Sequence, residues 1–403
     1  MYYIEHDSVR YKNFVVIQNF LFKTIGLSPW TVNGAQKCDK NQRVHNDQNY
    51  ECNFSYFGSF YNIMIFVCVV SLTFYVKFNG GLHQKQQDSF LTSSISMNIY
   101  YLSALISSVI LVIYIIKQKL IINVINRFKS VDKKLLRYAA SELKSNKIIS
   151  IIFMINLFMS ICYEIFEIYY YPLLSAIIRD FPVIINSLVI IQFTIILDVI
   201  NKRFKIINLA ISKFEINNNC RSMSSSLSVT NLSVLRESVL NDVGGIKCAY
   251  MELCEICQDI GDFFGPSILI IILYTGVAMI CDLYYGIVSL MVEDFDSMVS
   301  LSDGVWVIWI IFEFIVLTTS VTTVEEESGK TGNIIDSVMD QCAMDEQVGK
   351  VLFKFSHDLL HRKVELTACD IVPLNRTLLQ TITGTIATYL IILVKFRIST
   401  PSN

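Results

Sequence analysis

Charged residues are scarce in this chain of 403 residues. Asp, Glu, Lys and Arg make up 17% of the sequence, whereas an average soluble domain carries about 25%. The formal net charge is −2, so the basic excess of a nucleic-acid-binding protein is also missing. Hydrophobic residues make up 53%, and the mean hydropathy is +0.49. This composition excludes a cytosolic enzyme or a secreted disulfide scaffold and predicts a membrane protein.

The chemical motifs of common enzymes are absent as well. We find no P-loop, no Gly-rich dinucleotide fingerprint and no His-Glu-x-x-His zinc pair. Cys254-x-x-Cys257 is a lone pair, and a structural zinc site needs two more ligands at suitable spacing. We therefore expect no catalytic residues, no metal and no cofactor.

The apolar residues are gathered into blocks of roughly 20 residues, the length that crosses a bilayer core. Each block must be helical, because only a helix satisfies its own backbone hydrogen bonds in lipid. The stretch Phe14–Leu27 is interrupted by Lys23 and does not read as a signal peptide. The fold class is thus an all-α membrane protein with seven transmembrane helices: Tyr56–Val76, Asn98–Ile116, Ile148–Glu167, Phe181–Ile200, Pro266–Met291, Val305–Thr322 and Leu378–Val394.

The distribution of Lys and Arg sets the orientation of these helices, since basic residues favour the cytosolic side. Of the 33 basic residues, 28 lie before span one or in the connections that follow spans two, four and six. The other side holds only five, namely Lys77, Lys85, Arg179, Lys395 and Arg397. We therefore expect a cytosolic N-terminus and an extracellular C-terminus. This orientation is opposite to that of a G-protein-coupled receptor, and the outer connections also lack cysteine for a surface disulfide.

The predicted cytosolic segments define the domain organisation. Residues 1–55 form an N-terminal segment, 56–323 hold spans one to six, 324–375 form a further cytosolic region, and 376–403 hold span seven and a short tail. Asn126–Lys144 and Leu240–Ile260 are expected to extend neighbouring spans. Residues 217–238 are rich in Ser and Asn and read as a disordered linker.

One amphipathic helix is expected over Ile334–Leu360. Its apolar residues recur at steps of three and four, which places them on one face. That stripe comprises Ile335, Val338, Met339, Cys342, Val348, Leu352, Phe355 and Leu359. Periodicity alone leaves two partners open for it, the same chain or copies of the chain in a central bundle.

Acidic residues interleaved with aromatic ones lie inside the spans, where a charge is costly and suggests function. Such a mixture suits a pocket for a small amphiphilic ligand, a sugar, or a cationic alkaloid held against a ring. The alternative is lipid-facing aromatic belts with hydrogen bonds between helices. The candidate pocket residues are Tyr163, Glu164, Glu167, Tyr170, Asp282, Tyr284, Tyr285, Trp306, Trp309 and Glu313.

The C-terminal stretch resembles the signature of insect gustatory receptors, which share a superfamily with insect odorant receptors. The family pattern is Thr-Tyr, five apolar residues and Gln-Phe; here it reads Thr388, Tyr389, Leu390–Val394, Lys395 and Phe396. The upstream runs His361–Glu365 and Thr367–Cys369, and the segment Phe20–Trp30 with its Gly-x-x-Pro, are also similar to the family.

This resemblance implies a homotetrameric, ligand-gated, non-selective cation channel in the plasma membrane of a chemosensory neuron, embedded in the lipid bilayer. Span seven would line the pore for permeating cations, with Ile392 as an apolar gate near Lys395. A pocket among spans two to six would bind a small-molecule tastant. The resemblance assigns the amphipathic stripe to contacts between subunits, through Ile335, Met339, Cys342, Leu352, Phe355 and Leu359.

Three departures from the family pattern bear on function. Lys395 replaces the motif Gln, and four such lysines near a pore would disfavour cations. Asp370 replaces a Gly. Leu390 replaces a Glu common in the sweet-taste branch, which favours a bitter plant metabolite as the ligand. The alternatives are a fructose-type channel, a subunit that needs a partner, or a metabotropic seven-span receptor that signals through G proteins.

Overall fold

The computed structural model describes residues 18–33, 51–78, 90–138, 147–170, 173–222, 229–291, 297–341 and 346–399. Within these ranges, seven helices are long and apolar enough to cross a membrane, which confirms the predicted fold class. They are α2 (Tyr56–Phe78), α3 (Phe90–Ile116), α5 (Lys147–Tyr170), α6 (Leu173–Ser222), α7 (Val229–Met291), α8 (Ser297–Gln341) and α10 (Arg376–Ser399).

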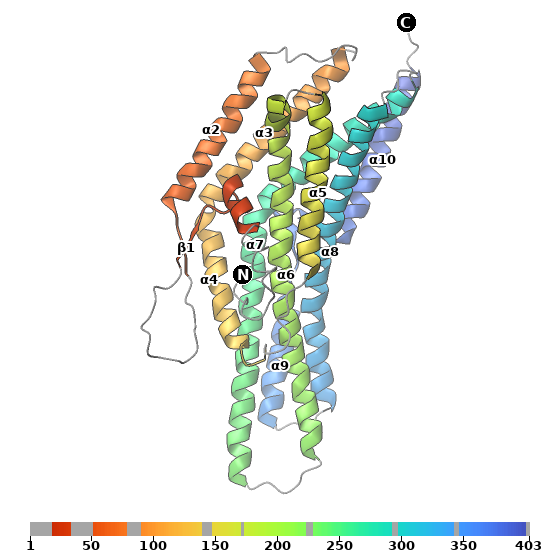
Figure 1. Cartoon of the computed structure of the whole chain (residues 1–403). Helices are drawn as coiled ribbons and strands as arrows, with labels where there is room; N and C mark the ends of the chain where they lie inside the picture. Colours follow the sequence, from red (N-terminus) through yellow and green to blue (C-terminus); the bar gives the residue numbers. More distant parts are fainter. Residues whose placement is uncertain are drawn as a thin grey trace.

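Three of these helices continue far beyond the length that a bilayer requires. α6, α7 and α8 have 50, 63 and 45 residues, and Figure 1 shows them running together into the lower half of the molecule. Two shorter helices, α4 (Gln118–Leu135) and α9 (Glu346–Leu360), pack there as well. α10 ends at the opposite, upper end of the molecule (Figure 1). The molecule thus has a seven-helix half and a narrower helical half built from extensions of the spans.

The predicted disordered linker over residues 217–238 is too long. α6 continues to Ser222 and α7 begins at Val229, so most of that segment is helical, while residues 223–228 lie outside the described ranges. Extending a helix that already exists costs little per residue, which outweighs the weak helix propensity of Ser and Asn.

The predicted amphipathic helix over Ile334–Leu360 is also two separate pieces. Ile335 and Val338 belong to the end of α8, and Leu352 and Phe355 belong to α9. α9 folds back beside the extensions of α7 and α8 (Figure 1). The apolar stripe from both pieces therefore meets within one chain, which periodicity alone did not reveal.

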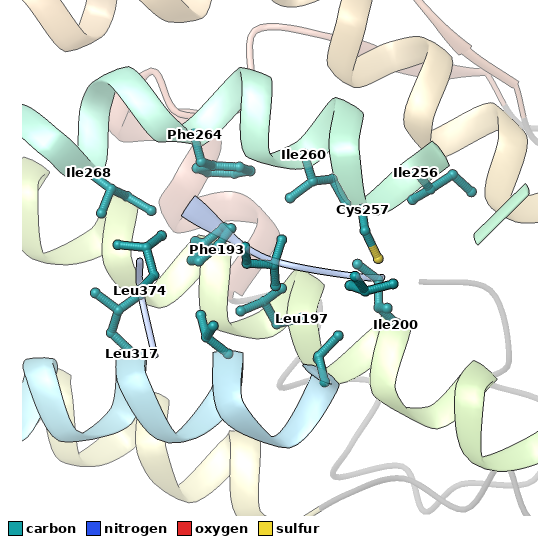
Figure 2. Close-up of a cluster of buried hydrophobic side chains, with 14 of the residues drawn as sticks. Phe193, Leu197, Ile200, Ile256, Cys257, Ile260, Phe264, Ile268, Leu317 and Leu374 are labelled. Atoms are coloured by element: carbon teal, nitrogen blue, oxygen red, sulfur yellow. The ribbon is translucent and has the colours of Figure 1, made fainter. Parts of the chain in front are cut away.

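Large aliphatic and aromatic side chains form a buried core between α6 and α7. In Figure 2, Phe193 and Leu197 of α6 face Phe264 and Ile260 of α7, with all four side chains fully buried or nearly so. Leu374, from the segment that precedes α10, inserts into the same cluster (Figure 2). The entry to the last span is therefore fixed to the core of the bundle by hydrophobic burial.

A small hairpin joins α9 to α10. Its strands are β3 (Thr367–Ala368) and β4 (Val372–Pro373), paired antiparallel. Cys369 and Asp370 form the turn with φ angles of 55° and 57°, a left-handed conformation that Gly adopts most easily and that Asp tolerates better than most residues. This geometry explains why the family pattern has Gly at position 370. The Thr367 hydroxyl lies 3.1 Å from Asp370 Oδ1, a hydrogen bond across the turn.

The hairpin contacts both α7 and α8. The backbone N–H of Leu366 donates to Glu325 Oε1 of α8 at 3.0 Å. A Cβ placed on Gly265 of α7 would lie 3.0 Å from the backbone nitrogen of Cys369, so a side chain larger than hydrogen would crowd the turn. The contacts with α7 and α8 therefore determine where α10 begins.

A second short sheet lies near the start of the chain. β1 (Thr31–Asn33) pairs antiparallel with β2 (Glu51–Asn53). The side-chain amide of Asn126 in α4 bonds both backbone groups of Cys52 in β2, at 3.2 and 3.1 Å. These bonds attach the segment before α2 to the side of α4.

Candidate functional site

A small buried cavity lies between α6, α7 and α8 in the seven-helix half. Its volume is about 20 Å³, which is room for about one water molecule. Its wall mixes aromatic, aliphatic and polar side chains: Val183, Asn186, Ser187, Ile271, Tyr274, Thr275, Trp306, Trp309, Ile310 and Glu313. In this conformation the cavity is too small for an organic ligand, so a ligand must push the three helices or their side chains apart.

A buried carboxyl group marks one side of this cavity. Glu313 of α8 is only 7% exposed. Asn156 of α5 donates through Nδ2 to Glu313 Oε1 at 3.2 Å and lies 2.9 Å from the hydroxyl oxygen of Ser187 in α6. Three helices are therefore linked by one polar cluster at the cavity wall, in an otherwise apolar layer.

The ten candidate pocket residues divide into two groups. Trp306, Trp309 and Glu313 line the cavity, and the ring of Tyr163 lies against Trp309 at a centroid distance of 6.0 Å. The other described candidates do not line it: Glu164 and Glu167 lie on α5, and Asp282, Tyr284 and Tyr285 on the last turns of α7. The side chain of Tyr170 is outside the described part.

Seven wall residues were not predicted from the sequence: Val183, Asn186, Ser187, Ile271, Tyr274, Thr275 and Ile310. Asn156 was not predicted either. The signal that could have found the polar ones is a neutral polar residue within an apolar span, such as Asn186-Ser187 in α6. The sequence prediction rested on acidic and aromatic residues, whereas neutral polar residues are common at helix contacts in membranes.

A larger cleft of about 610 Å³ opens where α7 meets the α9–α10 connection. Its charges are largely matched: Arg362 lies 3.4 Å from Glu255, which also pairs with Arg127 of α4 at 2.6 Å. Cys254, Cys257 and Cys369 line it too, but no group of three or more His, Cys, Asp or Glu side chains in the described residues has metal-binding geometry.

The last span, α10, contacts its own chain along one narrow face only. Leu378 and Ile386 are its buried residues. Away from this buried face, Thr377, Thr381, Thr385, Thr388, Ile392 and Lys395 recur at steps of three and four, so they share one helical face. All six are exposed. We call this row the α10 stripe.

The α10 stripe is polar except at Ile392. The hydroxyls of Thr381, Thr385 and Thr388 each donate to the carbonyl four residues earlier, at 2.8–3.0 Å. Their oxygens are thus left as outward acceptors. Of the other predicted pore residues, Tyr389 and Phe396 are exposed on the flank of the stripe.

The predicted subunit-contact residues are mostly buried inside one chain. Ile335 and Phe355 have no exposed surface and Leu352 has 2%, so the prediction that these three contact another subunit is wrong. They pack in the shared core of α7, α8 and α9, because folding α9 back on its own chain covers the stripe. Met339 and Leu359 are half-buried, and Cys342 lies outside the described residues. α9 instead exposes Phe353 and Leu360.

Known proteins resemble this chain in sequence and in fold. Residues 19–400 match a family model described as 7tm chemosensory receptor. Gustatory receptor 28a of Drosophila melanogaster is 28% identical over 174 residues, 41% of this chain and 38% of that protein. Gustatory receptor 28b of the same organism is 28% identical over 158 residues, 38% of this chain and 33% of that protein. The matched segment thus spans about a third of the length of either relative.

The fold is also found among solved structures. Olfactory receptor OR5 from Machilis hrabei, in complex with eugenol, superposes with a TM-score of 0.62 over 96% of this chain and 99% of that one, at 13% identity. At this identity the likeness concerns the fold alone. The family match over nearly the whole chain and the shared seven-helix architecture lead to one conclusion: the chain belongs to the seven-transmembrane chemosensory receptor family of gustatory and olfactory type, and is a receptor rather than an enzyme.

Proposed function

We propose that this receptor is a homotetrameric, ligand-gated, non-selective cation channel that detects a small-molecule tastant. It resides in the plasma membrane of a chemosensory neuron, with its N-terminus in the cytosol. Four copies of α10 surround the pore, and residues exposed on α9, such as Phe353, hold the subunits together on the cytosolic side.

The α10 stripe is the observation that carries this proposal. A row of polar side chains along a membrane-crossing helix faces another helix or water more favourably than lipid, because lipid offers their oxygens no hydrogen-bond donors. Among the residues that the structure describes, no element covers Thr381, Thr385 or Thr388. Facing a water-filled axis formed by copies of α10 satisfies them, and their outward oxygens suit a passing cation.

Ile392 is the residue of the α10 stripe that closes the pore in the absence of a ligand. It is the apolar member of the stripe, one turn beyond Thr388. A ring of apolar side chains narrow enough to expel water blocks ions without a covalent plug. Moving α10 outward would widen the ring, let water return and allow current.

Ligand binding reaches α10 through α7 and α8. Both helices line the cavity and both contact the hairpin that precedes α10. A ligand larger than about one water molecule fits only when these helices separate. The ligand therefore favours the separated state by its differential affinity, and the hairpin carries the displacement to the start of α10.

The aromatic and acidic wall of the cavity supports a bitter plant metabolite over a sugar. Two indole rings and the aliphatic side chains of Val183, Ile271 and Ile310 form half of the wall and match a hydrocarbon skeleton. A sugar presents many hydroxyls, each of which needs a partner when it leaves water.

Replacing Ile392 by Ala tests the channel and its gate together. Expressed alone in oocytes, Ile392→Ala should pass cation current without any ligand, because the apolar ring is lost. Leu393→Ala is the matched control, since Leu393 is partly exposed on another face of the same helix. Leak at the parent level, at equal surface expression, argues against this gate. A C-terminal tag accessible only from the cytosol would instead support a metabotropic receptor.

A further inference from the structure

We propose that the cavity between α6, α7 and α8 selects small organic ammonium ions, with Glu313 as the counter-charge and the Trp306 and Trp309 rings as the cation-binding faces. This inference rests on the proposed function, since it names the chemical class of the ligand. The cavity wall includes one carboxyl group and no Lys or Arg among the described residues.

Glu313 gives the cavity a carboxyl group, and no Lys or Arg of the described residues lines the wall beside it. Its hydrogen-bond partner Asn156 is neutral, and the side chain is almost fully withdrawn from solvent. A buried carboxylate without a cation is costly, and adding an ammonium that also donates a hydrogen bond compensates for that cost. A neutral ligand of the same shape gains no such pairing.

The two tryptophans provide a second attraction for the same charge. Trp306 and Trp309 are 6% and 2% exposed and both line the cavity with Glu313. An ammonium within about 6 Å of an indole face is attracted by the ring, and the attraction grows when the site excludes water. Tyr163 lies against Trp309, so the orientation of that indole is already restricted before a ligand arrives.

Asn186 adds a requirement on the rest of the ligand. Asn186 is 4% exposed and lines the cavity. Its side-chain oxygen Oδ1 accepts a hydrogen bond from the Ser107 hydroxyl at 3.3 Å. Its side-chain nitrogen Nδ2 has no hydrogen-bond partner among the described residues. A buried donor without an acceptor is costly. A ligand oxygen in the cavity would satisfy it, so the preferred ligand carries an acceptor as well as an ammonium group.

Further carboxyl groups lie beyond the cavity wall. Asp180 of α6 and Asp282 of α7 lie near the wall residue Tyr274, and Asp303 of α8 lies near Asp282. In its ionised form, each of these groups adds negative potential near the cavity. Such a potential raises the local concentration of cations and lowers that of anions.

Two probes of matched shape test this inference. The full-length protein in detergent at pH 7 is titrated with 2-(4-methoxyphenyl)ethylamine, which is an ammonium ion there, and with neutral 2-(4-methoxyphenyl)ethanol, so that both probes carry an ether oxygen as the acceptor. Binding is followed by intrinsic fluorescence, and the cavity holds two of the three tryptophans in the chain. We expect the ammonium to bind at least tenfold more tightly than the alcohol.

The charge of Glu313 should account for this preference. Glu313→Gln keeps the shape and removes the charge, so the ratio of the two dissociation constants should fall towards one. Glu237→Gln is the matched control, because Glu237 is exposed near the start of α7, and it should keep the tenfold ratio. The wild-type comparison remains decisive where Glu313→Gln does not fold.

Equal binding of both probes to the wild type, no saturable binding of the ammonium, or an unchanged ratio in Glu313→Gln overturns the inference. The Ile392→Ala current separates this failure from that of the proposed function, because it needs no ligand. A conducting Ile392→Ala channel with equal probe binding rejects the ligand class alone. Selective binding with a silent Ile392→Ala variant rejects the gate and keeps the ligand class.

Discussion

Removing the charge of Lys395 should make the channel conduct cations better and exclude anions more strongly. Lys395 lies on the α10 stripe one turn beyond Ile392, and its side chain is exposed. In a tetramer, four ammonium groups would ring the pore at this level. A passing cation would meet all four, whereas a chloride ion would be attracted.

The size of the effect follows from Coulomb's law. If neighbouring ammonium groups lie about 10 Å apart around a fourfold axis, each is about 7 Å from a cation on the axis and repels it by about 0.6 kcal/mol in water. Four charges give about 2.4 kcal/mol, which screening over a Debye length of about 8 Å reduces to about 1 kcal/mol. That corresponds to about a fivefold reduction in cation entry.

Lys395→Gln tests this estimate by restoring the residue of the family motif. We expect about fivefold larger single-channel cation conductance at physiological salt, and a larger gain at low salt, where screening is weaker. The reversal potential in a NaCl gradient should also move towards the sodium equilibrium potential. The matched control is Arg397→Gln, which removes the same charge two residues away on a different face of α10.

Unchanged conductance and reversal potential in Lys395→Gln would refute the reasoning. In that case the lysine side chains extend away from the axis into interfacial water, which long cationic side chains readily do. An equal effect of Arg397→Gln would also refute it, because the effect would then reflect the general surface charge and not the stripe.

Two further predictions concern the packing around α10 and α9. Gly265→Ala should lower the free energy of unfolding by about 1–3 kcal/mol, because the new Cβ would lie 3.0 Å from the backbone of the hairpin. The control Gly261→Ala, with open space around the new Cβ, should leave the free energy of unfolding equal or higher. Equal melting temperatures of the two variants in detergent would contradict the contact between Gly265 and the hairpin. Phe355→Ala should destabilise the chain by about 3–5 kcal/mol, since its ring is fully buried against Tyr250. Phe353→Ala should leave the melting temperature unchanged and weaken the tetramer, as measured by crosslinking, since Phe353 is 67% exposed. Loss of stability in both variants would refute the assignment of Phe355 to the core of one chain and of Phe353 to the contact between subunits.

The transmembrane layout could be predicted from the sequence because lipid leaves few alternatives. Each apolar block of about 20 residues had to become a helix, and seven such blocks became α2, α3, α5, α6, α7, α8 and α10. The long extensions of α6 and α7 were harder, because Ser- and Asn-rich ends carry no apolar pattern. Their helical state depends on continuity with the packed spans rather than on local composition.

The cavity and the packing of α9 needed three-dimensional information. Trp306, Trp309 and Glu313 were chosen by residue type, and all three line the cavity. Asn156 and Ser187 are 31 residues apart, and no local pattern brings them together. Likewise, the Ile335–Phe355 stripe had the right period for burial, but periodicity does not say whether the covering surface comes from the same chain or another.

The course of α7 has a consequence for how receptors of this shape can diversify. Above Pro266, α7 contributes Ile271, Tyr274 and Thr275 to the cavity; below it, Gly265 and Glu255 contact the segment that leads into α10. In the proposed channel, ligand recognition and pore opening would therefore depend on different turns of one helix. Mutations in the upper turns would change which compounds bind, while the lower turns would keep the contacts that position α10. Such a division would let an animal acquire a sensor for a new compound without a change in the channel itself.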